Sequence, residues 1–221
     1  MALTEDTKVQ IARRIAAELQ DDWVVNVGTG MPTAVLKCVP DERDIIFHSE
    51  NGIVGMGPEP TDPAQIDTDL QSAGKRPVTL MPGGCFVHHR DSFAIARGGM
   101  LDAAILGGYQ VAENGDLANW KLPGAKLGSI GGAMDICVGA KRVFIMMTHT
   151  TPDGKPKIVR SLNYPLTASR CVTKIFTELA VIAVTAAGLV LETLAPGVSL
   201  ETVQKLTEPK LILGKGLGLP G

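Results

Sequence analysis

The sequence predicts an α/β fold in which a mostly parallel central sheet carries helices on both faces. Short runs made up almost entirely of apolar residues, such as "WVVNV" and "AAIL", are typical of strands buried on both sides. Stretches with the spacing of amphipathic helices alternate with several of these runs. Strands that alternate with helices favour parallel pairing, and the helices then cover both faces in a three-layer arrangement.

Composition agrees with one globular domain spanning residues 1–221, of which 45% are hydrophobic and 20% charged. The net charge of −2 and the aromatic content of 4% argue against a surface for nucleic acid or an anionic membrane. The polar N-terminus is unlike a targeting peptide, and Gly188 interrupts the longest apolar run, which indicates buried strands instead of a membrane span. We therefore expect a cytoplasmic protein without nucleic-acid or membrane partners.

The same patterns place the remaining elements. A helix is expected at 4–19, where Thr4 can cap the N-terminus and acidic residues follow at the positive end of the helix dipole. Residues 29–39 indicate a loop that opens into a helix, and further helices are predicted around 92–97, 134–139 and 168–179. Strands are predicted at 23–28, 45–48, 78–81, 103–106, 143–147, 181–184 and 189–194. A hairpin and a short helix are expected within 181–206, before a glycine-rich and flexible tail at 210–221.

Two sets of potential metal ligands give weak signals. His88 and His89 are adjacent, and neighbouring residues of a strand point to opposite faces, so a surface pair is favoured over a shared ion. The cysteines lie far apart and form no C-x-x-C pair, which predicts free, buried thiols at Cys38, Cys85, Cys137 and Cys171. No metal site is expected.

Two glycine-rich segments can bring backbone N–H groups close to a ligand. In "VVNVGTGMPTAV", Gly28 and Gly30 follow a strand, but Thr33 replaces the third glycine of a dinucleotide-binding loop, so NAD is not expected. An anion at the helix start and a purely structural turn both stay open. In "GSIGGAMDICVGA", Gly131 and Gly132 precede a predicted helix, where N–H groups either stabilise an oxyanion or form a tight turn.

Glu50 stands at the end of the predicted strand "IIFHS", directly before Asn51-Gly52 and a glycine-rich loop. A single carboxylate in a loop is by default a solvated residue. The carboxyl ends of parallel strands, however, are where α/β folds gather their site residues. No second acid lies close by in sequence to form a general acid–base pair, so a nucleophile that forms a covalent acyl intermediate is the functional alternative.

The segment "SENGIVGMGP" resembles the Ser-Glu-Asn-Gly motif of class I coenzyme A transferases, in the B (beta) subunit of the 3-oxoacid type. The segments "VGTGMPT", "DSFAIARGGMLDAAILGGYQVAENGDLANW", "IGGAMD" and "PLTASRCV" occur in the order of that family, and the likeness covers nearly the whole chain. Relatives of this type include succinyl-CoA:3-oxoacid, acetate:acetoacetate and 3-oxoadipate transferases.

The resemblance implies that Glu50 is the catalytic nucleophile of a CoA transfer that passes through an anhydride and a glutamyl-CoA thioester. It also implies that the backbone N–H groups of Gly132 and Ala133 stabilise the oxyanions. Further residues near the substrate or CoA are then Gly28, Gly30, Asn51, Gly52 and Gly131. No cofactor is implied, because the CoA thioester is a substrate. The family pairs this subunit with an A (alpha) subunit, so we expect an A2B2-type heteromer or a larger complex.

The chain departs from the family pattern at Ala125, Ser129, Ile130 and Thr148. The sequence therefore does not specify which acyl group is transferred. Ketone-body, fatty-acid and aromatic degradation are all compatible with the resemblance. Two alternatives use the same fold, namely an acyl-CoA lyase or hydrolase and a non-catalytic ligand-binding protein. The intact Ser-Glu-Asn-Gly motif favours the transferase over both.

Overall fold

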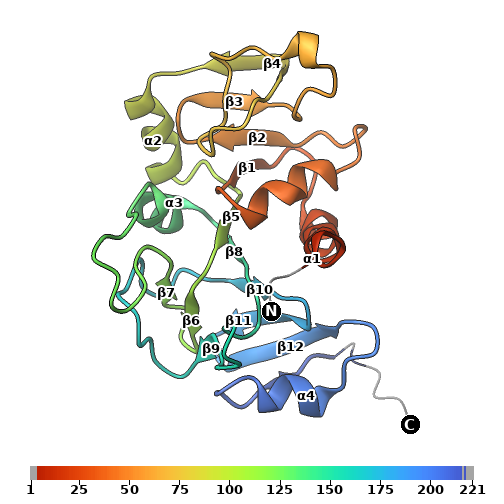
Figure 1. Cartoon of the computed structure of the whole chain (residues 1–221), viewed down its shortest axis with the longest axis vertical. Coiled ribbons are helices and arrows are strands. Elements are labelled where there is room, and N and C mark those ends of the chain that lie inside the picture. Colours follow the sequence, from red (N-terminus) through yellow and green to blue (C-terminus); the bar gives the residue numbers. More distant parts are fainter. Residues whose placement is uncertain (1–3, 216, 218–221) are drawn as a thin grey trace.

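A ten-stranded sheet forms the centre of the computed structural model, which describes residues 4–215 and 217. The strand order is β13-β12-β11-β10-β8-β5-β1-β2-β3-β4 (Figure 1). The central strands, from β10 to β2, are all parallel. Antiparallel pairs extend the sheet on both sides of this centre. The predicted mostly parallel sheet is therefore confirmed, with antiparallel additions towards its edges.

The elements have the following bounds. The helices are α1 (Glu5–Glu18), α2 (His89–Arg97), α3 (Ala133–Gly139) and α4 (Leu200–Lys205), with 3-10 turns η1 (Met31–Lys37) and η2 (Pro63–Gln65). The large sheet contains β1 (Val24–Val27), β2 (Ile46–Ser49), β3 (Ile53–Met56), β4 (Leu80–Phe86), β5 (Ala103–Gly107), β8 (Val143–Met146), β10 (Lys174–Phe176), β11 (Ala180–Thr185), β12 (Gly188–Leu194) and β13 (Ile212–Leu213). A smaller sheet is formed by β6 (Gln110–Ala112), β7 (Leu117–Ala118) and β9 (Ile158–Val159).

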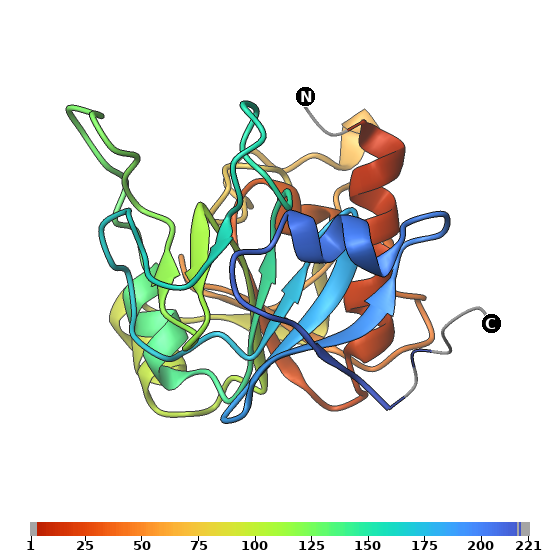
Figure 2. The same ribbon diagram turned by 90° about the horizontal axis from the view of Figure 1, so that it is seen from below.

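Helices cover both faces of the large sheet, which gives the expected three layers (Figures 1 and 2). The alternation along β5 shows how the sequence achieves this. Ala103 and Ile105 pack in the core that contains the buried side of α1, whereas Ala104 and Leu106 pack in the core that contains α2 and α3. A strand with apolar residues on both sides therefore contributes to two separate cores.

The N-terminal helix α1 begins and is buried as the sequence predicts. The Thr4 hydroxyl accepts a hydrogen bond from the backbone N–H of Thr7 at 3.2 Å, which caps the first turn. Its apolar stripe is fully or almost fully buried: Ile11, Ala12, Ile15 and Ala16. Lys174 on β10 forms an ion pair with Glu18 at 2.9 Å and so ties the last turn of α1 to the sheet.

The prediction of a helix around residues 168–179 is wrong. Residues 168–173 form a loop, in which the N–H groups of Cys171 and Val172 donate to the carbonyl of Gly115, and residues 174–176 form strand β10. The β-branched Val172, Thr173 and Ile175 favour an extended backbone, and β10 obtains partners on both sides from β8 and β11.

Strand β3 is absent from the prediction because its glycines indicate a loop. Gly55 has a φ of +80° and lies where the pairing of β3 with β4 shifts register, so it is a bulge inside a strand. Strand β4 continues five residues beyond the predicted 78–81, through Pro82 and two glycines. Proline is tolerated there because β4 is the edge strand of the sheet.

Three smaller expectations also need correction. The tail is partly ordered, because Ile212 and Leu213 pair in parallel with β12, whereas residues 216 and 218–221 lie outside the described part. His88 and His89 are not in a strand, since they start α2, although both are exposed as expected of a surface pair. The cysteines are free, but only Cys137 is buried. Within residues 4–215, no helix has the length and apolar character needed to cross a membrane.

Candidate functional site

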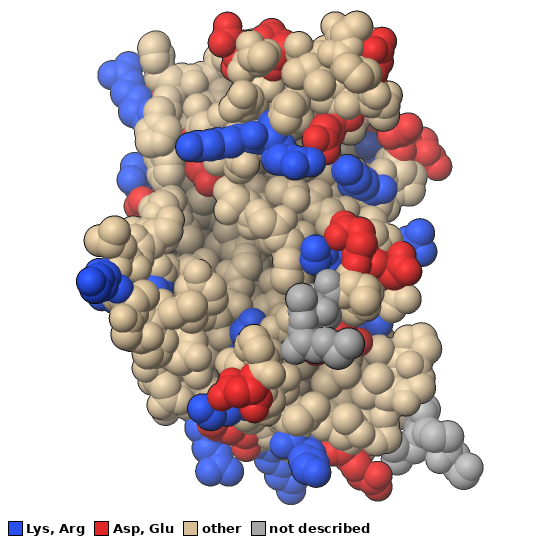
Figure 3. Space-filling model, viewed as in Figure 1, with Lys and Arg blue, Asp and Glu red and all other residues tan. Residues whose placement is uncertain are grey.

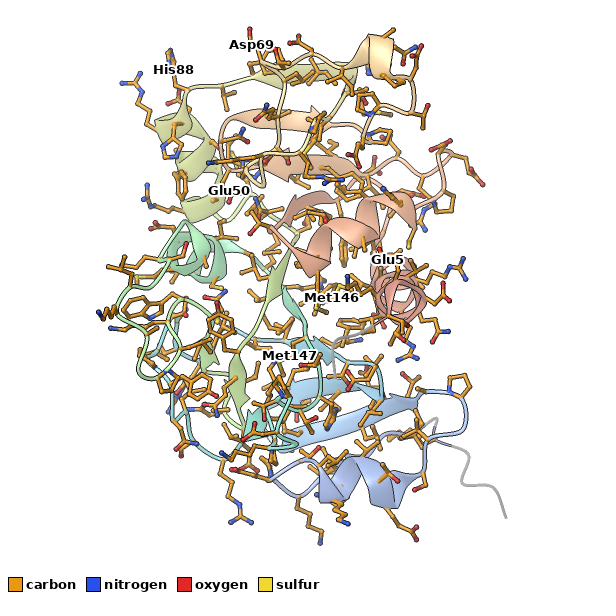
Figure 4. All side chains as sticks on the ribbon, viewed as in Figure 1. Glu5, Glu50, Asp69, His88, Met146 and Met147 are labelled. Carbon is orange, nitrogen blue, oxygen red and sulfur yellow. The ribbon has the colours of Figure 1, made fainter. Side chains whose placement is uncertain are left out.

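A cleft of about 730 Å³ lies at the carboxyl ends of four neighbouring parallel strands, in the order β2, β1, β5 and β8. Glu50 follows β2, Gly28 follows β1, Gly107 ends β5 and Met147 follows β8. Figure 4 labels Glu50 and Met147 on this face, and Figure 3 shows that its middle is hollowed, with charged side chains mainly around the hollow. The cleft is therefore at the edge of the sheet where α/β folds bind ligands.

A tight turn between β2 and β3 fixes the backbone of Glu50. The N–H of Gly52 donates to the carbonyl of Ser49 at 3.0 Å, and the carbonyl of Gly52 accepts from Val87 at 2.9 Å. Gly52 has a φ of +119°, which favours glycine. The Asn51 side chain donates to the carbonyl of Gln71 at 2.7 Å. Asn51 and Gly52 thus hold the turn, while the half-buried Glu50 lines the cleft.

A buried polar chain connects Glu50 to the interior. The side-chain amide of Asn26 on β1 lies 3.4 Å from Oε2 of Glu50 and 3.0 Å from Nδ1 of His48. His48 Nε2 lies 2.8 Å from Oγ of Ser92 on α2. Asn26, His48 and Ser92 are fully buried. A carboxylate held by a buried amide has a restricted orientation, which suits a group that must meet a reacting carbon.

The protonation state of His48 follows from its burial, which lowers its pKa to about 4. The imidazole is therefore neutral at pH 7. Because the Asn26 amide donates to Nδ1, the ring proton is on Nε2 and is donated to Ser92. Asn26 Oδ1 is buried and has no hydrogen-bond partner within residues 4–215, an unusual cost for a polar atom. Such costs are most often retained at functional sites.

Two buried histidines should make the fold sensitive to mild acid. Burial lowers the pKa of both His48 and His149 from 6.5 to about 4, with Lys157 also lowering that of His149. Between pH 6.5 and 4 the unfolded chain binds protons that the folded chain does not, so stability falls with pH, and the loss stops growing below pH 4. We expect the titration of each histidine to lower the free energy of unfolding by about 2–3 kcal/mol between pH 7 and pH 4.5. Urea unfolding at a series of pH values measures this change.

The variant His149→Gln removes one of these two titrations and should give a shallower dependence on pH. His89→Gln is the matched control, because His89 is exposed and its replacement should leave the dependence unchanged. An unfolding free energy that is constant from pH 7 to 4.5 would contradict the buried, neutral state of both rings.

The glycine turn before α3 lines the same cleft as Glu50, although the two segments are about eighty residues apart in the sequence. Gly131 has a φ of +52° and Gly132 is the residue that caps α3. Among the described residues, the N–H groups of Gly132 and Ala133 have no hydrogen-bond acceptor. A Cβ on Gly132 would approach Cζ of Phe93 to 2.6 Å, so only glycine allows α2 and the turn to pack this closely.

The loop that contains Gly28 and Gly30 lines two adjoining cavities. Gly28 lines the Glu50 cleft, and its N–H donates to the carbonyl of Ile105 at 2.8 Å. Gly30 lines only the second cavity, of about 520 Å³, which lies beside η1 and also exposes Lys8 and Arg76. The structure therefore brings Gly28, Gly131, Gly132 and Ala133 together with Glu50, but not Gly30.

Sequence reasoning did not single out Asn26, Ser92 or Lys157. Asn26 carries a signal, because it is the polar residue within the apolar strand "WVVNV". Lys157, which also lines the cleft, precedes the short strand β9 and has no such signal. Within the described part of the chain, no three His, Cys, Asp or Glu side chains are close enough to hold a metal ion.

Comparisons with known proteins identify the class of this site. The chain matches the model of the family described as coenzyme A transferase over residues 8–206. It is 47% identical to the B (beta) subunit of 3-oxoadipate CoA-transferase from Acinetobacter baylyi, over 93% of this chain and 95% of that relative. It is 43% identical to human mitochondrial succinyl-CoA:3-ketoacid coenzyme A transferase 2, over 92% of this chain and 40% of that relative.

A solved structure supports the fold. The acyl-CoA transferase apoenzyme from Escherichia coli O157:H7 has a TM-score of 0.74 and 23% identity over 97% of this chain, which spans 43% of the length of that protein. At this identity the likeness shows the fold alone. Together with the family match, these findings define an enzyme subunit that transfers coenzyme A. The chain belongs to the coenzyme A transferase family, and within that family it is of the B (beta) type.

Proposed function

We propose that this chain, paired with an A subunit, transfers CoA from an acyl-CoA donor to a free carboxylic acid through a covalent thioester on Glu50. The observation that carries the proposal is the position of Glu50. Its side chain lines a cleft at the carboxyl ends of parallel strands, and the Gly132–Ala133 turn, whose N–H groups have no acceptor among the described residues, lines the same cleft. The names of the relatives support a 3-oxoacid or other short-chain acid as the acyl group.

The reaction proceeds in two symmetrical halves. The Glu50 carboxylate attacks the thioester carbonyl of the donor and expels CoA thiolate, which leaves an acyl-glutamyl anhydride. The thiolate then attacks the glutamyl carbonyl, releases the donor acid and forms glutamyl-CoA. The acceptor carboxylate attacks this thioester, displaces the thiolate and forms a second anhydride. Attack of the thiolate on the acceptor acyl carbon gives the new acyl-CoA and restores Glu50.

Each attack creates a tetrahedral oxyanion, and the N–H groups of Gly132 and Ala133 are the proposed donors. A single donor of this kind contributes about 3 kcal/mol to transition-state stabilisation in enzymes that have been measured. Asn26 holds Oε2 of Glu50 in one orientation, so the other oxygen is presented to the thioester. Atoms balance among the acyl-CoA, Glu50 and the acceptor acid, and the scheme uses no further cofactor.

We expect CoA to become attached to this chain when the complex with the A subunit is incubated with an acyl-CoA and no acceptor. Mass spectrometry should place the added CoA on the peptide that contains Glu50. The purified complex should contain two copies of each subunit, which its mass in solution checks. If acyl-CoA is instead hydrolysed or cleaved continuously without an acceptor and without labelling, the lyase or hydrolase alternative is correct. If acyl-CoA is bound and left unchanged, the protein is a ligand-binding relative.

A further inference from the structure

Two of the four cysteines, from segments distant in the sequence, are in contact next to the core. Cys137 lies on α3 and is almost fully buried, whereas Cys171 is half-buried in the loop before β10. Both pack in the same apolar cluster, and the Cys137 thiol donates a hydrogen bond to the sulfur of Cys171. Among the described residues, no third His, Cys, Asp or Glu side chain completes a metal site with them. The pair is therefore a site for thiol chemistry.

The two thiols differ in acidity and in access. The hydrogen bond from Cys137 lowers the pKa of the Cys171 thiol, and the same contact together with burial raises the pKa of Cys137. Because an oxidant reacts with a thiolate and not with a thiol, Cys171 reacts first, and it is also the more exposed of the two. Cys137 then lies against the oxidised sulfur. A reactive cysteine next to a resolving cysteine is the usual arrangement of a redox-sensitive pair.

We propose that Cys137 and Cys171 are a redox modification site, at which hydrogen peroxide closes a reversible disulfide that slows CoA transfer. The Cys171 thiolate attacks one oxygen of the peroxide and the O–O bond breaks, which leaves sulfenic acid and a hydroxide that takes up a proton. The Cys137 sulfur then attacks the sulfenic sulfur, the S–O bond breaks, and a second water leaves with the Cys137 proton. Two thiols are oxidised to one disulfide, and one peroxide is reduced to two waters.

The disulfide would draw α3 towards the loop that carries Cys171. A covalent S–S bond is about 2.05 Å long, shorter than a hydrogen-bonded contact between two sulfurs. The loop is anchored, because the N–H groups of Cys171 and Val172 donate to the Gly115 carbonyl at 3.1 and 3.0 Å. The helix α3 has only seven residues, so α3 takes up most of the movement.

This movement reaches the cleft through the first turn of α3. Cys137 lies about one helical turn after Ala133, so a shift of α3 displaces the N–H groups of the Gly132–Ala133 turn. A displacement of roughly 1 Å at a catalytic group can cost about 100-fold in rate. The expected effect on transfer rests on the proposed oxyanion role of this turn, whereas formation of the disulfide does not.

Oxidation of the complex with the A subunit by hydrogen peroxide tests the site. Free thiols are blocked with N-ethylmaleimide, and the chain is digested without reduction. Mass spectrometry should then find the peptides of Cys137 and Cys171 joined, two hydrogens lighter than the sum of the separate peptides. CoA transfer should fall about 10- to 100-fold as the joined peptide appears, and dithiothreitol should reverse both changes.

Cys137→Ala removes the resolving thiol, so oxidation of Cys171 should stop at the sulfenic acid, which dimedone labels, and transfer should persist in peroxide. Cys85→Ala is the matched control, because Cys85 is exposed on β4 and its removal should leave the joined peptide and the loss of transfer unchanged. Absence of the joined peptide, or a joined peptide without loss of transfer, would overturn the inference. A complex that transfers no CoA before oxidation would reject the proposed function instead, and the joined peptide would still decide whether the two thiols pair.

Discussion

Replacing Glu50 with glutamine in the complete complex is expected to lower CoA transfer by about 10⁴-fold or more, the scale seen when a catalytic nucleophile is removed. Glutamine keeps the length of the side chain and can still contact the Asn26 amide through its carbonyl, but it has no nucleophilic oxygen anion. Steady-state transfer and mass labelling should be lost together. The unfolding free energy should change little, because Glu50 is only half-buried and makes one long hydrogen bond, at 3.4 Å.

Glu50→Asp separates the presence of the charge from its position. The carboxylate is withdrawn by one methylene, roughly 1 Å, and a displacement of this size can cost about 100-fold in rate. Aspartate should therefore retain weak activity, whereas glutamine should retain none. Glu59→Gln is a control on the adjoining surface, where Glu59 pairs with Arg76 at 2.9 Å outside the Glu50 cleft. Transfer at a near-normal rate by Glu50→Gln would show that another group is the nucleophile.

The second large effect is expected from Gly52→Ala. A Cβ at this position would lie 2.4 Å from the backbone carbonyl oxygen of Val87, and the φ of +119° is itself unfavourable for alanine. Because the obstructing atom belongs to the backbone of the next segment, the turn that carries Glu50 must move. We expect a loss of about 2–5 kcal/mol in unfolding free energy from strain and overpacking, and about 100-fold in kcat from the displaced carboxylate.

Gly83→Ala separates the effect of backbone strain from the effect of overpacking against Val87. Gly83 has a φ of +84°, but a Cβ there would meet no atom within 4 Å, so only the backbone strain should be felt. This control should lose less stability than Gly52→Ala and should keep full activity, since β4 does not line the cleft. Equal effects of the two substitutions on kcat would contradict a positioning role for the Gly52 turn. Urea unfolding and steady-state kinetics measure both quantities.

The centre of the fold was predictable because its strands are apolar on both sides. Strands β1, β5 and β8 and the hairpin of β11 and β12 lie where the runs of apolar residues indicate them. The strands at the β3–β4 edge of the sheet were not predictable in this way. Strands β3 and β4 contain the glycines and the proline that indicate a loop, and only the neighbouring strands show that these residues form a bulge and an edge. The segment 168–179 has a helical spacing of apolar residues, but its backbone partners on β8 and β11 make it extended.

The candidate site could be predicted in part, from residues whose type is unusual for their place. Glu50 stands at a strand end, and the paired glycines precede a helix, so each was visible on its own. That they share a cleft depends on how the turn before α3 packs beside the ends of the parallel strands, which the sequence does not state. Asn26 contacts His48 and Glu50, which lie 22 and 24 residues away in the sequence, and such contacts leave no local pattern. The catalytic roles of Glu50, Gly132 and Ala133 stay predictions.

The attachment of Glu50 to the sheet also limits how the enzyme can move during its cycle. Asn26 lies on β1, whose residues pair with β2 on one side and β5 on the other, in the most deeply covered part of the molecule. The Asn26 amide therefore stays in place unless these central pairs open, which in most proteins happens only on a scale close to global unfolding. The half-buried Glu50 carboxylate, held by one hydrogen bond of 3.4 Å, can still rotate about its own side-chain bonds beside this fixed amide. We expect the rearrangements between the two half-reactions in the Glu50 side chain, the pantetheine arm, the exposed turn at Gly131 and the A subunit, and not in the central strands.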